Sequence, residues 1–297
     1  MSSIRVNPNV LPDLLSALAQ TRQQENTATL ELASGSRINQ PSDDPAGAAQ
    51  MVANRDLSSQ ADTFLRSITS VNGLLQTADS TLSSVVTALQ RAISLGVQGA
   101  NGTLSNSDRS DIANELGGIQ QQLISLANTS YQGEFIFAGT ATIQPFVASS
   151  TSSSGVSYQG TAGTNTVQVG TNYSLQINQP GSQIFSAAGG DVFQSVADLV
   201  TALQTNSNIG NAIAAVRGAF DHVTSQRVFY GNAVNQLNAQ QNYLNSENVD
   251  LATAANSISG ADMAQTAATL TQAEVALNAE LAAMGKISQN NLFDYLK

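Results

Sequence analysis

Apolar side chains recur at alternating steps of four and three residues along two long stretches, from Leu57 to Ala92 and from Ile213 to Ile258. A heptad repeat of this length predicts long helices that pack against partner helices along one line of positions, which we call the seam. A few polar residues in the second seam are expected to lower its stability and to fix its register. The first seam comprises Leu57, Ala61, Phe64, Ile68, Val71, Leu75, Ala78, Leu82, Val85, Leu89 and Ala92. The second comprises Ile213, Val216, Phe220, Val223, Arg227, Tyr230, Val234, Leu237, Gln241, Leu244, Asn248, Leu251, Ala255 and Ile258.

Shorter patterns predict the remaining helices of the two halves. The first long helix is expected to end at Gly96, Gly99 and Gly102, and another to begin near Ser107 and to form an antiparallel hairpin with it. A further helix is expected to begin near Ser195.

The two ends of the chain carry weaker helical patterns, because polar residues interrupt both seams. We expect these end segments to be mobile in the free monomer and to order on assembly, since short isolated helices are marginally stable. The exposed apolar residues at the C-terminus favour association. The N-terminal seam is expected at Leu11, Leu15, Leu18, Arg22, Glu25, Thr29 and Leu32, and the C-terminal stripe at Leu270, Glu274, Leu277, Leu281 and Met284, followed by Leu292, Phe293, Tyr295 and Leu296.

The middle of the chain has a different character. Between Phe135 and Gly190 there is no charged residue, and Gly, Ser and Thr abound. Apolar residues here fall on alternate positions, which predicts strands and hairpins. The fold class expected is therefore mainly α, with long antiparallel helices from both chain halves forming a coiled-coil-like rod and a small β-rich inserted domain at residues 135–194. The alternating positions are Val167, Val169, Tyr173, Leu175 and Ile177.

Composition excludes several classes of function. Only 11% of the 297 residues are charged and the formal net charge is −10, so we expect no binding to nucleic acid, whose phosphates would repel this surface. The chain has no cysteine, which excludes disulfides and thiolate metal sites. We find neither a secretory signal nor an apolar run approaching the roughly 18 residues of a membrane span.

Candidate chemistry is sparse. His222 is the single histidine, and Asp221 beside it cannot face it on a helix, so we expect a flank or surface position. The pair Asp43 and Asp44 falls short of the six or more oxygen ligands of calcium. We expect no catalytic residues, no cofactor and no metal.

One connection between helices is strongly specified. Gly35 can adopt the positive φ that ends a helix, and Pro41 prevents the helix from continuing. Asp44 directly before Pro45 is typical of an N-cap followed by proline in the first helical position. A helix should end near Ser34 and another should begin after Asp44.

The residues around this connection resemble a family signature. The string Leu32-Ala33-Ser34-Gly35-Ser36-Arg37-Ile38-Asn39, followed by Asp43-Asp44-Pro45-Ala46, is similar to the N-terminal signature of bacterial flagellins and related hook-filament junction proteins. Further landmarks point within that family to the junction proteins. They are Tyr131-Gln-Gly-Glu-Phe-Ile-Phe-Ala-Gly-Thr140, Pro145-Phe146, Tyr158-Gln-Gly160, Pro180-Gly181, Ile184-Phe185, Ile287-Ser288 and Leu292-Phe293-Asp294-Tyr295-Leu296.

The resemblance implies an architecture and a role. Residues 1–40 and 255–297 would form terminal helices that pair in an inner core, residues 41–134 and 195–254 a helical rod domain, and residues 135–194 a β-rich domain that projects outward. The implied function is a structural adapter at the hook-filament junction, exported without a cleaved signal through the flagellar type III apparatus to an extracellular position. Expected partners are hook-associated protein 1, flagellin, further copies in a ring and a flagellar export chaperone. Candidate assembly residues are Gly35, Arg37, Asn39, Asp43, Asp44, Leu281, Leu292, Phe293 and Leu296.

Two other functions stay open on the sequence alone. One is a minor flagellin of the filament itself, which would share the signature around Gly35 but end differently. The other is a secreted adhesin or enzyme whose β-rich insertion binds a ligand. The lack of ionisable residues from Phe135 to Gly190 disfavours the latter, although it leaves room for binding a neutral sugar.

Overall fold

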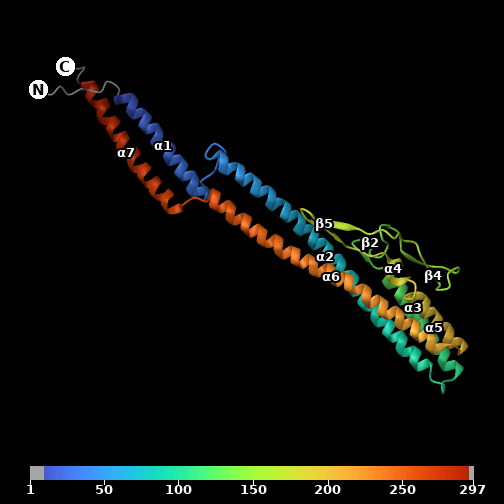
Figure 1. Cartoon of the computed structure of the whole chain (residues 1–297). Helices are drawn as coiled ribbons and strands as arrows, with labels where there is room; N and C mark the ends of the chain where they lie inside the picture. The colour runs from blue at the N-terminus through green and yellow to red at the C-terminus, as the bar shows by residue number, and fades with distance from the viewer. Residues whose placement is uncertain (1–9, 294–297) are drawn as a thin grey trace. The chain divides into compact units, whose positions relative to one another are not determined.

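The computed structural model describes the backbone of residues 10–293 and the side chains of residues 12–286. Its described part contains the helices α1 to α7 and the short strands β1 to β6 (Figure 1). The chain forms two compact units. Unit 1 comprises Met1–Gln60 and Glu247–Lys297, and unit 2 comprises Ala61–Ser246. The helices α2 (Pro45–Gly99) and α6 (Ile209–Ser259) contribute residues to both units.

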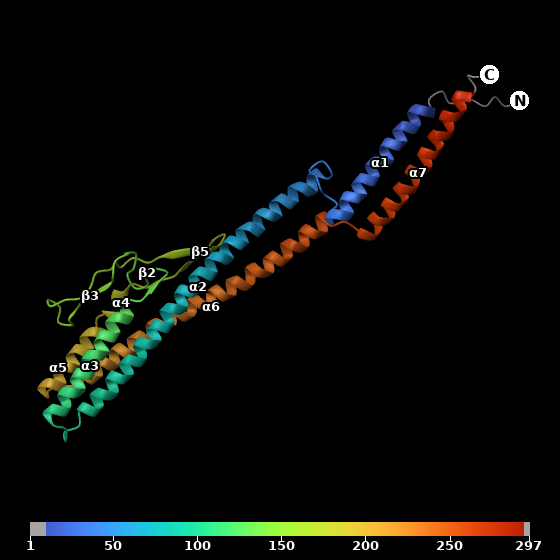
Figure 2. The ribbon, with the colours of Figure 1, turned by 180° about the vertical axis from the view of Figure 1, so that it is seen from behind.

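In unit 1, helices α1 (Val10–Ser34) and α7 (Met263–Phe293) lie side by side and antiparallel (Figures 1 and 2). Two hydrogen bonds join their side chains. The Thr21 hydroxyl donates to Glu280 Oε1 at 3.0 Å, and the Thr266 hydroxyl donates to Glu31 Oε2 at 3.3 Å. Within one chain, these two helices therefore pair along an interface that includes polar groups.

The seam of α1 lies one position away from the expected one at several points. Leu15, Arg22 and Thr29 are exposed, whereas Leu18, Thr21 and Ala28 are buried. Apolar residues occupy neighbouring positions in this helix, so the spacing alone allows two seams, and contact with α7 selects one of them. The selected seam is Leu14, Leu18, Thr21, Glu25, Ala28 and Leu32.

The stripe of α7 needs a similar correction. Leu270, Leu277 and Met284 are half-buried as expected, but Glu274 and Leu281 are exposed. The buried and half-buried line of α7 is Thr266, Leu270, Ala273, Leu277, Glu280 and Met284.

The core of unit 2 confirms the two long seams. From Ala61 to Ala92 every predicted position of α2 is buried or half-buried, and the same holds for α6 from Ile213 to Leu244. The polar seam residue Arg227 makes a two-pronged ion pair with Asp79, with nitrogen to oxygen distances of 3.0 and 3.1 Å. This pair joins α6 to α2 at a fixed register.

Leu57 was expected at the start of the first seam and is exposed instead. The half-buried positions in this part of α2 are Met51, Asn54 and Ser58, which lead by steps of three and four to Ala61. The Ser58 hydroxyl donates to Asn248 Oδ1 on α6 at 3.1 Å. In unit 1 the seam between these helices is therefore more polar than in unit 2.

Helices α3 (Asn106–Ala127) and α5 (Val192–Thr205) complete the helical part of unit 2. The α3 N-terminus has a capping box, in which Ser105 and Asp108 bond each other's backbone N–H. Gly96 was expected to help end α2, but it lies inside the helix, where a Cβ would come within 3.1 Å of Leu199 on α5. Its lack of a side chain allows α5 to approach α2.

The strands form three antiparallel pairs: β1 (Ser130–Tyr131) with β2 (Glu134–Phe135), β3 (Phe146–Ala148) with β4 (Val156–Tyr158), and β5 (Thr166–Gly170) with β6 (Tyr173–Gln176). The short helix α4 (Gly181–Phe185) follows them. Four buried aromatic rings hold this part on the helical core, with neighbouring centroids 5.1 to 6.0 Å apart. The expected fold class, mainly α with a small β-containing part, is confirmed. The rings belong to Phe137, Phe146, Phe185 and Phe193.

Candidate assembly site

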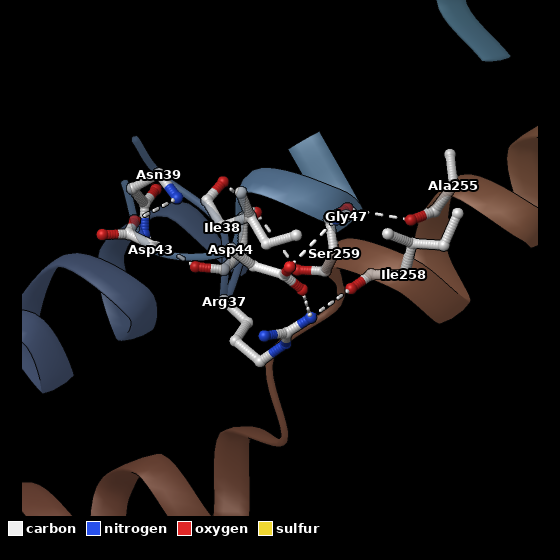
Figure 3. A network of polar contacts seen from close by, with 10 residues as sticks. Arg37, Ile38, Asn39, Asp43, Asp44, Gly47, Ala255, Ile258 and Ser259 are labelled. Atoms are coloured by element: carbon white, nitrogen blue, oxygen red, sulfur yellow. Dashed lines mark hydrogen bonds and ion pairs between the residues drawn. The ribbon is translucent and has the colours of Figure 1, made fainter. Parts of the chain in front are cut away.

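Two connections of unit 1, together with the helix ends that flank them, lie side by side: residues 34–47, around the turn from α1 to α2, and residues 258–262, around the turn from α6 to α7 (Figure 3). Together we call them the double-turn site. The backbone N–H of Arg37 donates to Ser259 O at 2.7 Å, and that of Ala261 donates to Gly35 O at 3.1 Å. These bonds form an antiparallel bridge between segments more than 200 residues apart in sequence.

Gly35 ends α1 in the way its sequence position predicts. Its φ is +68°, and its N–H donates to Glu31 O at 2.8 Å to close the last helical turn. A residue with a Cβ would be strained at this φ. The chain can therefore turn immediately after Ser34 and place residue 36 opposite Gly260.

Arg37 connects three elements. One guanidinium nitrogen, Nη2, lies 3.0 Å from Asp44 Oδ2 and also 3.0 Å from the carbonyl oxygen of Ile258 (Figure 3). A cation beside the last carbonyls of a helix interacts favourably with the helix dipole. Arg37 thus joins the C-terminal end of α6 to the residue that begins α2, while half of its side chain stays exposed.

Asp43 and Asn39 organise the turn itself. Asp43 Oδ2 accepts hydrogen bonds from the backbone N–H of Asn39 at 2.9 Å and of Gln40 at 2.8 Å. The Asn39 side-chain amide donates to Ser36 O at 2.7 Å. The carboxylate of Asp43 therefore stabilises the conformation of the loop by accepting hydrogen bonds from its backbone.

Asp44 is the N-cap of α2, as predicted. Its Oδ1 accepts a hydrogen bond from the Gly47 N–H at 3.0 Å, and Pro45 follows as the first helical residue. The Gly47 hydrogen bond, followed by the hydrogen bond from Arg37, lowers the pKa of the Asp44 carboxyl below its ordinary value. Asp44 stays ionised where an ordinary aspartate would begin to take up a proton.

Gly47 and Ile38 give the turn a small apolar centre. Ile38 is buried, and a Cβ on Gly47 would lie 2.7 Å from Ile38 Cδ1 and 2.6 Å from Asp44 Oδ2. Only glycine leaves room for both the capping carboxylate and the Ile38 side chain. Ile38 and Gly47 carry this packing, and neither was among the residues predicted to take part in assembly.

The second connection was not predicted as part of the site. The Ser36 hydroxyl donates to Ile38 O at 2.9 Å and lies 3.1 Å from Ser259 O. Asp262 caps α7 by accepting from the Ala264 and Gln265 N–H groups at 3.0 and 3.1 Å. The aspartate shortly after a glycine is a helix-start signal that could have marked this second turn.

Of the predicted C-terminal assembly residues, Leu281 is the one whose side chain the structure describes. Leu281 is on α7, with its side chain exposed, and is not part of the double-turn site. Leu292 and Phe293 are the last residues of α7, and their side chains lie outside the described part of the chain, as does Leu296 entirely. The structure brings together Gly35, Arg37, Asn39, Asp43 and Asp44.

A shallow groove of about 170 Å³ borders the double-turn site. Its apolar lining includes Ile38, Pro41, Met51 and Val52, and Arg55 also lines it. Val52 is 67% exposed. The groove therefore offers apolar surface next to a cation.

The residues of the double-turn site interact with one another through hydrogen bonds and an ion pair. Within residues 10–293, no group of three or more histidine, aspartate or glutamate side chains could hold a metal ion. His222 lies in unit 2, half-buried, with Nε2 2.8 Å from Gln183 O. In the part of the chain that the structure describes, no helix is both long enough and apolar enough to span a membrane.

The sequence of the chain is similar to those of known flagellar proteins. Residues 9–142 match the bacterial flagellin N-terminal helical region. The chain is 35% identical over 159 residues to flagellar hook-associated protein 3 of Salmonella typhimurium, covering 53% of this chain and 49% of that protein. It is 31% identical over 189 residues to flagellar hook-associated protein 3 of Escherichia coli, covering 63% and 58%. The chain thus spans about half the length of these two relatives.

Flagellin and a solved structure give longer but weaker matches. Flagellin of Listeria monocytogenes is 26% identical over 298 residues, covering 96% of each chain. The crystal structure of the flagellar junction protein FlgL from Legionella pneumophila superposes with a TM-score of 0.61 and 16% identity, covering 71% of this chain and all of that one. This likeness concerns the fold. The chain is therefore similar to bacterial flagellins and to flagellar hook-associated protein 3, and its residues 9–142 match the bacterial flagellin N-terminal helical region.

Proposed function

We propose that this chain is a structural subunit of the bacterial flagellum that acts as the adapter at the hook-filament junction. The observation that carries the proposal is the 35% identity to flagellar hook-associated protein 3 over a continuous 159 residues. The aromatic and glycine landmarks from Tyr131 to Phe185 add support, because Phe137, Phe146 and Phe185 form one buried cluster.

A minor flagellin is the second candidate, and one observation favours it. The match to Listeria flagellin extends over almost the whole of both chains, although at lower identity. A flagellin would build the filament itself, whereas a junction protein would sit between two different polymers.

The proposed role assigns a task to each part of the chain. Residues 1–40 and 255–297 would form an inner core on assembly, residues 41–134 and 195–254 a rod, and residues 135–194 an outer domain. The polar contacts of Thr21 and Thr266 across α1 and α7 support the first assignment, because a weakly apolar pair can repack when further copies arrive. The continuous apolar seams of α2 and α6 support a rigid rod.

The proposed neighbours are hook-associated protein 1 on one side, flagellin on the other and further copies of this chain in a ring. We further propose export through the flagellar type III apparatus with the help of an export chaperone, and an extracellular position without enzymatic activity. An adapter needs one surface for each neighbour, because two different helical polymers do not share an end face.

Within this role we propose that the double-turn site takes part in subunit contacts. Arg37 keeps about half of its side chain exposed, although it already bonds Asp44 and Ile258. An exposed ion pair contributes little to folding stability, but charges at interfaces select partners and register. Replacing Arg37 with Ala should therefore leave the melting temperature almost unchanged and reduce junction assembly, with Arg37→Lys as the matched variant that keeps the charge. A large loss of melting temperature would instead assign Arg37 to the fold of the monomer.

A deletion strain tests the junction role. Without this protein, cells should make hooks, fail to grow filaments and release flagellin into the medium. Electron micrographs of the cells and an immunoblot of the culture supernatant for flagellin provide both readouts. A minor flagellin would instead leave filaments present, shorter or altered in shape, and normal filaments would refute the junction assignment.

A further inference from the structure

The sequence contains two Asn-Gly pairs, and the structure places them in opposite environments. Asn101 and Gly102 lie in the exposed loop between α2 and α3, whereas Asn72 and Gly73 lie in the middle of α2. Asn-Gly is the dipeptide most open to intramolecular attack on the asparagine amide, because glycine places no side chain beside the attacking backbone nitrogen. The chain therefore carries a candidate reactive site together with an internal control.

We propose that Asn101 is a site of spontaneous covalent modification, at which the asparagine converts through a cyclic imide to aspartate and isoaspartate. This inference concerns the loop of unit 2 and does not depend on the flagellar role. The reaction class is intramolecular deamidation, with water as the only co-reactant.

The chemistry balances in two steps. In the first, the backbone nitrogen of Gly102 loses its proton and attacks Cγ of Asn101, so that an N–Cγ bond forms and the side-chain nitrogen leaves as ammonia. In the second, water adds to one of the two imide carbonyls and breaks one of the two C–N bonds. Opening on the side-chain side gives aspartate, and opening on the backbone side gives isoaspartate.

The loop leaves the attacking nitrogen accessible. Gly102 is exposed, and a Cβ built on it would meet no atom within 4 Å. A turn closes around it, because the Leu104 N–H donates to Asn101 O at 3.2 Å. Among the described residues, the N–H of Gly102 has no hydrogen-bond acceptor, so no bond has to break before it reacts.

Two donors are aimed at the oxygen on which charge develops during the attack. Asn101 Oδ1 accepts hydrogen bonds from the Thr103 N–H at 3.1 Å and from the Thr103 hydroxyl at 2.9 Å. As the Gly102 nitrogen bonds to Cγ, negative charge accumulates on Oδ1, and fixed donors stabilise such an oxyanion. Thr103 therefore lowers the barrier of the first step.

The second Asn-Gly pair lacks these features. Asn72 and Gly73 are inside a continuous helix, where each backbone N–H is bonded to the carbonyl four residues earlier. Gly73 also lies directly against the phenol of Tyr131, and Asn72 Oδ1 accepts from Gln76 at 3.1 Å. Reaction there requires local opening of α2, which costs free energy that the loop does not have to supply.

The test is peptide mapping by mass spectrometry after incubating the full-length purified protein at mildly alkaline pH. The peptide with Asn101 should gain the mass that accompanies replacement of an amide NH₂ by OH, and labelling by an isoaspartate methyltransferase should appear in the same peptide. The peptide with Asn72 should react at least about tenfold more slowly, because helix opening precedes its reaction. Equal rates at the two sites, or no conversion at Asn101, would overturn the proposal.

Two variants examine the mechanism. Gly102→Ala has room for its methyl group and a φ outside the left-handed region, so it should fold normally and slow the conversion clearly. Thr103→Val should also slow it, and Thr103→Ser, which keeps the hydroxyl, should restore it. An unchanged rate in Thr103→Val would overturn the stabilising role of Thr103, and an unchanged rate in Gly102→Ala would overturn attack by the Gly102 nitrogen. Circular dichroism before incubation verifies that each variant is folded.

Discussion

Replacing Thr21 with valine tests how the α1/α7 pair is held together. The Thr21 side chain is buried and its hydroxyl donates to Glu280 Oε1 at 3.0 Å, while Glu280 Oε2 is buried without a partner among the described residues. Valine matches threonine in shape but cannot donate. The substitution therefore leaves a half-buried carboxylate without its donor.

The magnitude follows from the type of bond. A hydrogen bond to a charged group contributes about 1.5 to 3 kcal/mol, and the partial exposure of Glu280 places this one near the lower end. Because about 1.4 kcal/mol corresponds to a factor of ten in an equilibrium constant, amides in the middle of α1 should exchange roughly tenfold faster in Thr21→Val.

The double variant Thr21→Val with Glu280→Leu should reverse the effect. It removes both polar partners and the unsatisfied oxygen together, and an apolar pair of similar size at such a site is often neutral or stabilising. Amide exchange in α1 should return to the rate of the unmodified chain or fall below it.

Hydrogen exchange of the free monomer, read by mass spectrometry on peptides of α1 and α7, measures these rates. The matched control is Thr29→Val, since Thr29 is exposed and, among the described residues, its hydroxyl bonds Glu25 O of its own helix at 2.8 Å and nothing on α7. Its effect should stay within about 0.5 kcal/mol. Unchanged exchange in Thr21→Val, or a double variant that exchanges as fast as the single one, would show that the Thr21–Glu280 hydrogen bond does not hold α1 against α7.

Three further predictions concern the fold and its pH dependence. Gly181→Ala should destabilise unit 2 by about 1 to 3 kcal/mol in urea titration, because its Cβ would lie 2.7 Å from both Phe137 O and a Phe146 ring carbon. The control is Gly117→Ala on α3, where a Cβ meets nothing within 4 Å, so this variant should stabilise unit 2 by up to about 1 kcal/mol. Leu75→Ala should cost about 2 to 5 kcal/mol by the same titration, since Leu75 is fully buried; a cost near zero would show that the site collapses freely. The pKa of Asp44 is lower in the folded chain than in the unfolded one. The stabilising effect of its ionised carboxylate is therefore complete above the pKa of an unfolded aspartate and is lost as the pH falls through the lower folded value. Hydrogen exchange in unit 1 should accordingly differ between the unmodified chain and Asp44→Asn near neutral pH, and the two should converge in strong acid.

The order of residues along the chain was sufficient to locate the long helices and the turn between α1 and α2. From Ala61 to Ala92 and from Ile213 to Leu244, every position of the predicted seams is buried or half-buried, so the periodicity identified the buried face of both helices. Gly35 and the Asp44-Pro45 pair act through their own backbone chemistry, which local sequence is sufficient to reveal.

Packing between segments selects the buried positions where two apolar lines of one helix compete, and it creates the contacts between distant parts of the chain. In α1, Leu14 and Leu15 are both available, and α7 buries the line of Leu14 rather than that of Leu15. Gly96 looked like a helix end, but the approach of Leu199 makes it a contact point inside α2. The cause is that periodicity describes one helix at a time, whereas the buried face depends on the partner.

In the double-turn site, too, local sequence revealed one part and contacts between distant segments created the other. Its first half, from Gly35 to Gly47, was visible as a turn, but the partners of Arg37 include the carbonyl of Ile258, which lies 221 positions along the chain. The bridge to Gly260 uses backbone atoms, which carry no side-chain signal in the sequence. Such a contact exists only once both chain halves have folded beside each other, because it depends on their register and not on residue type.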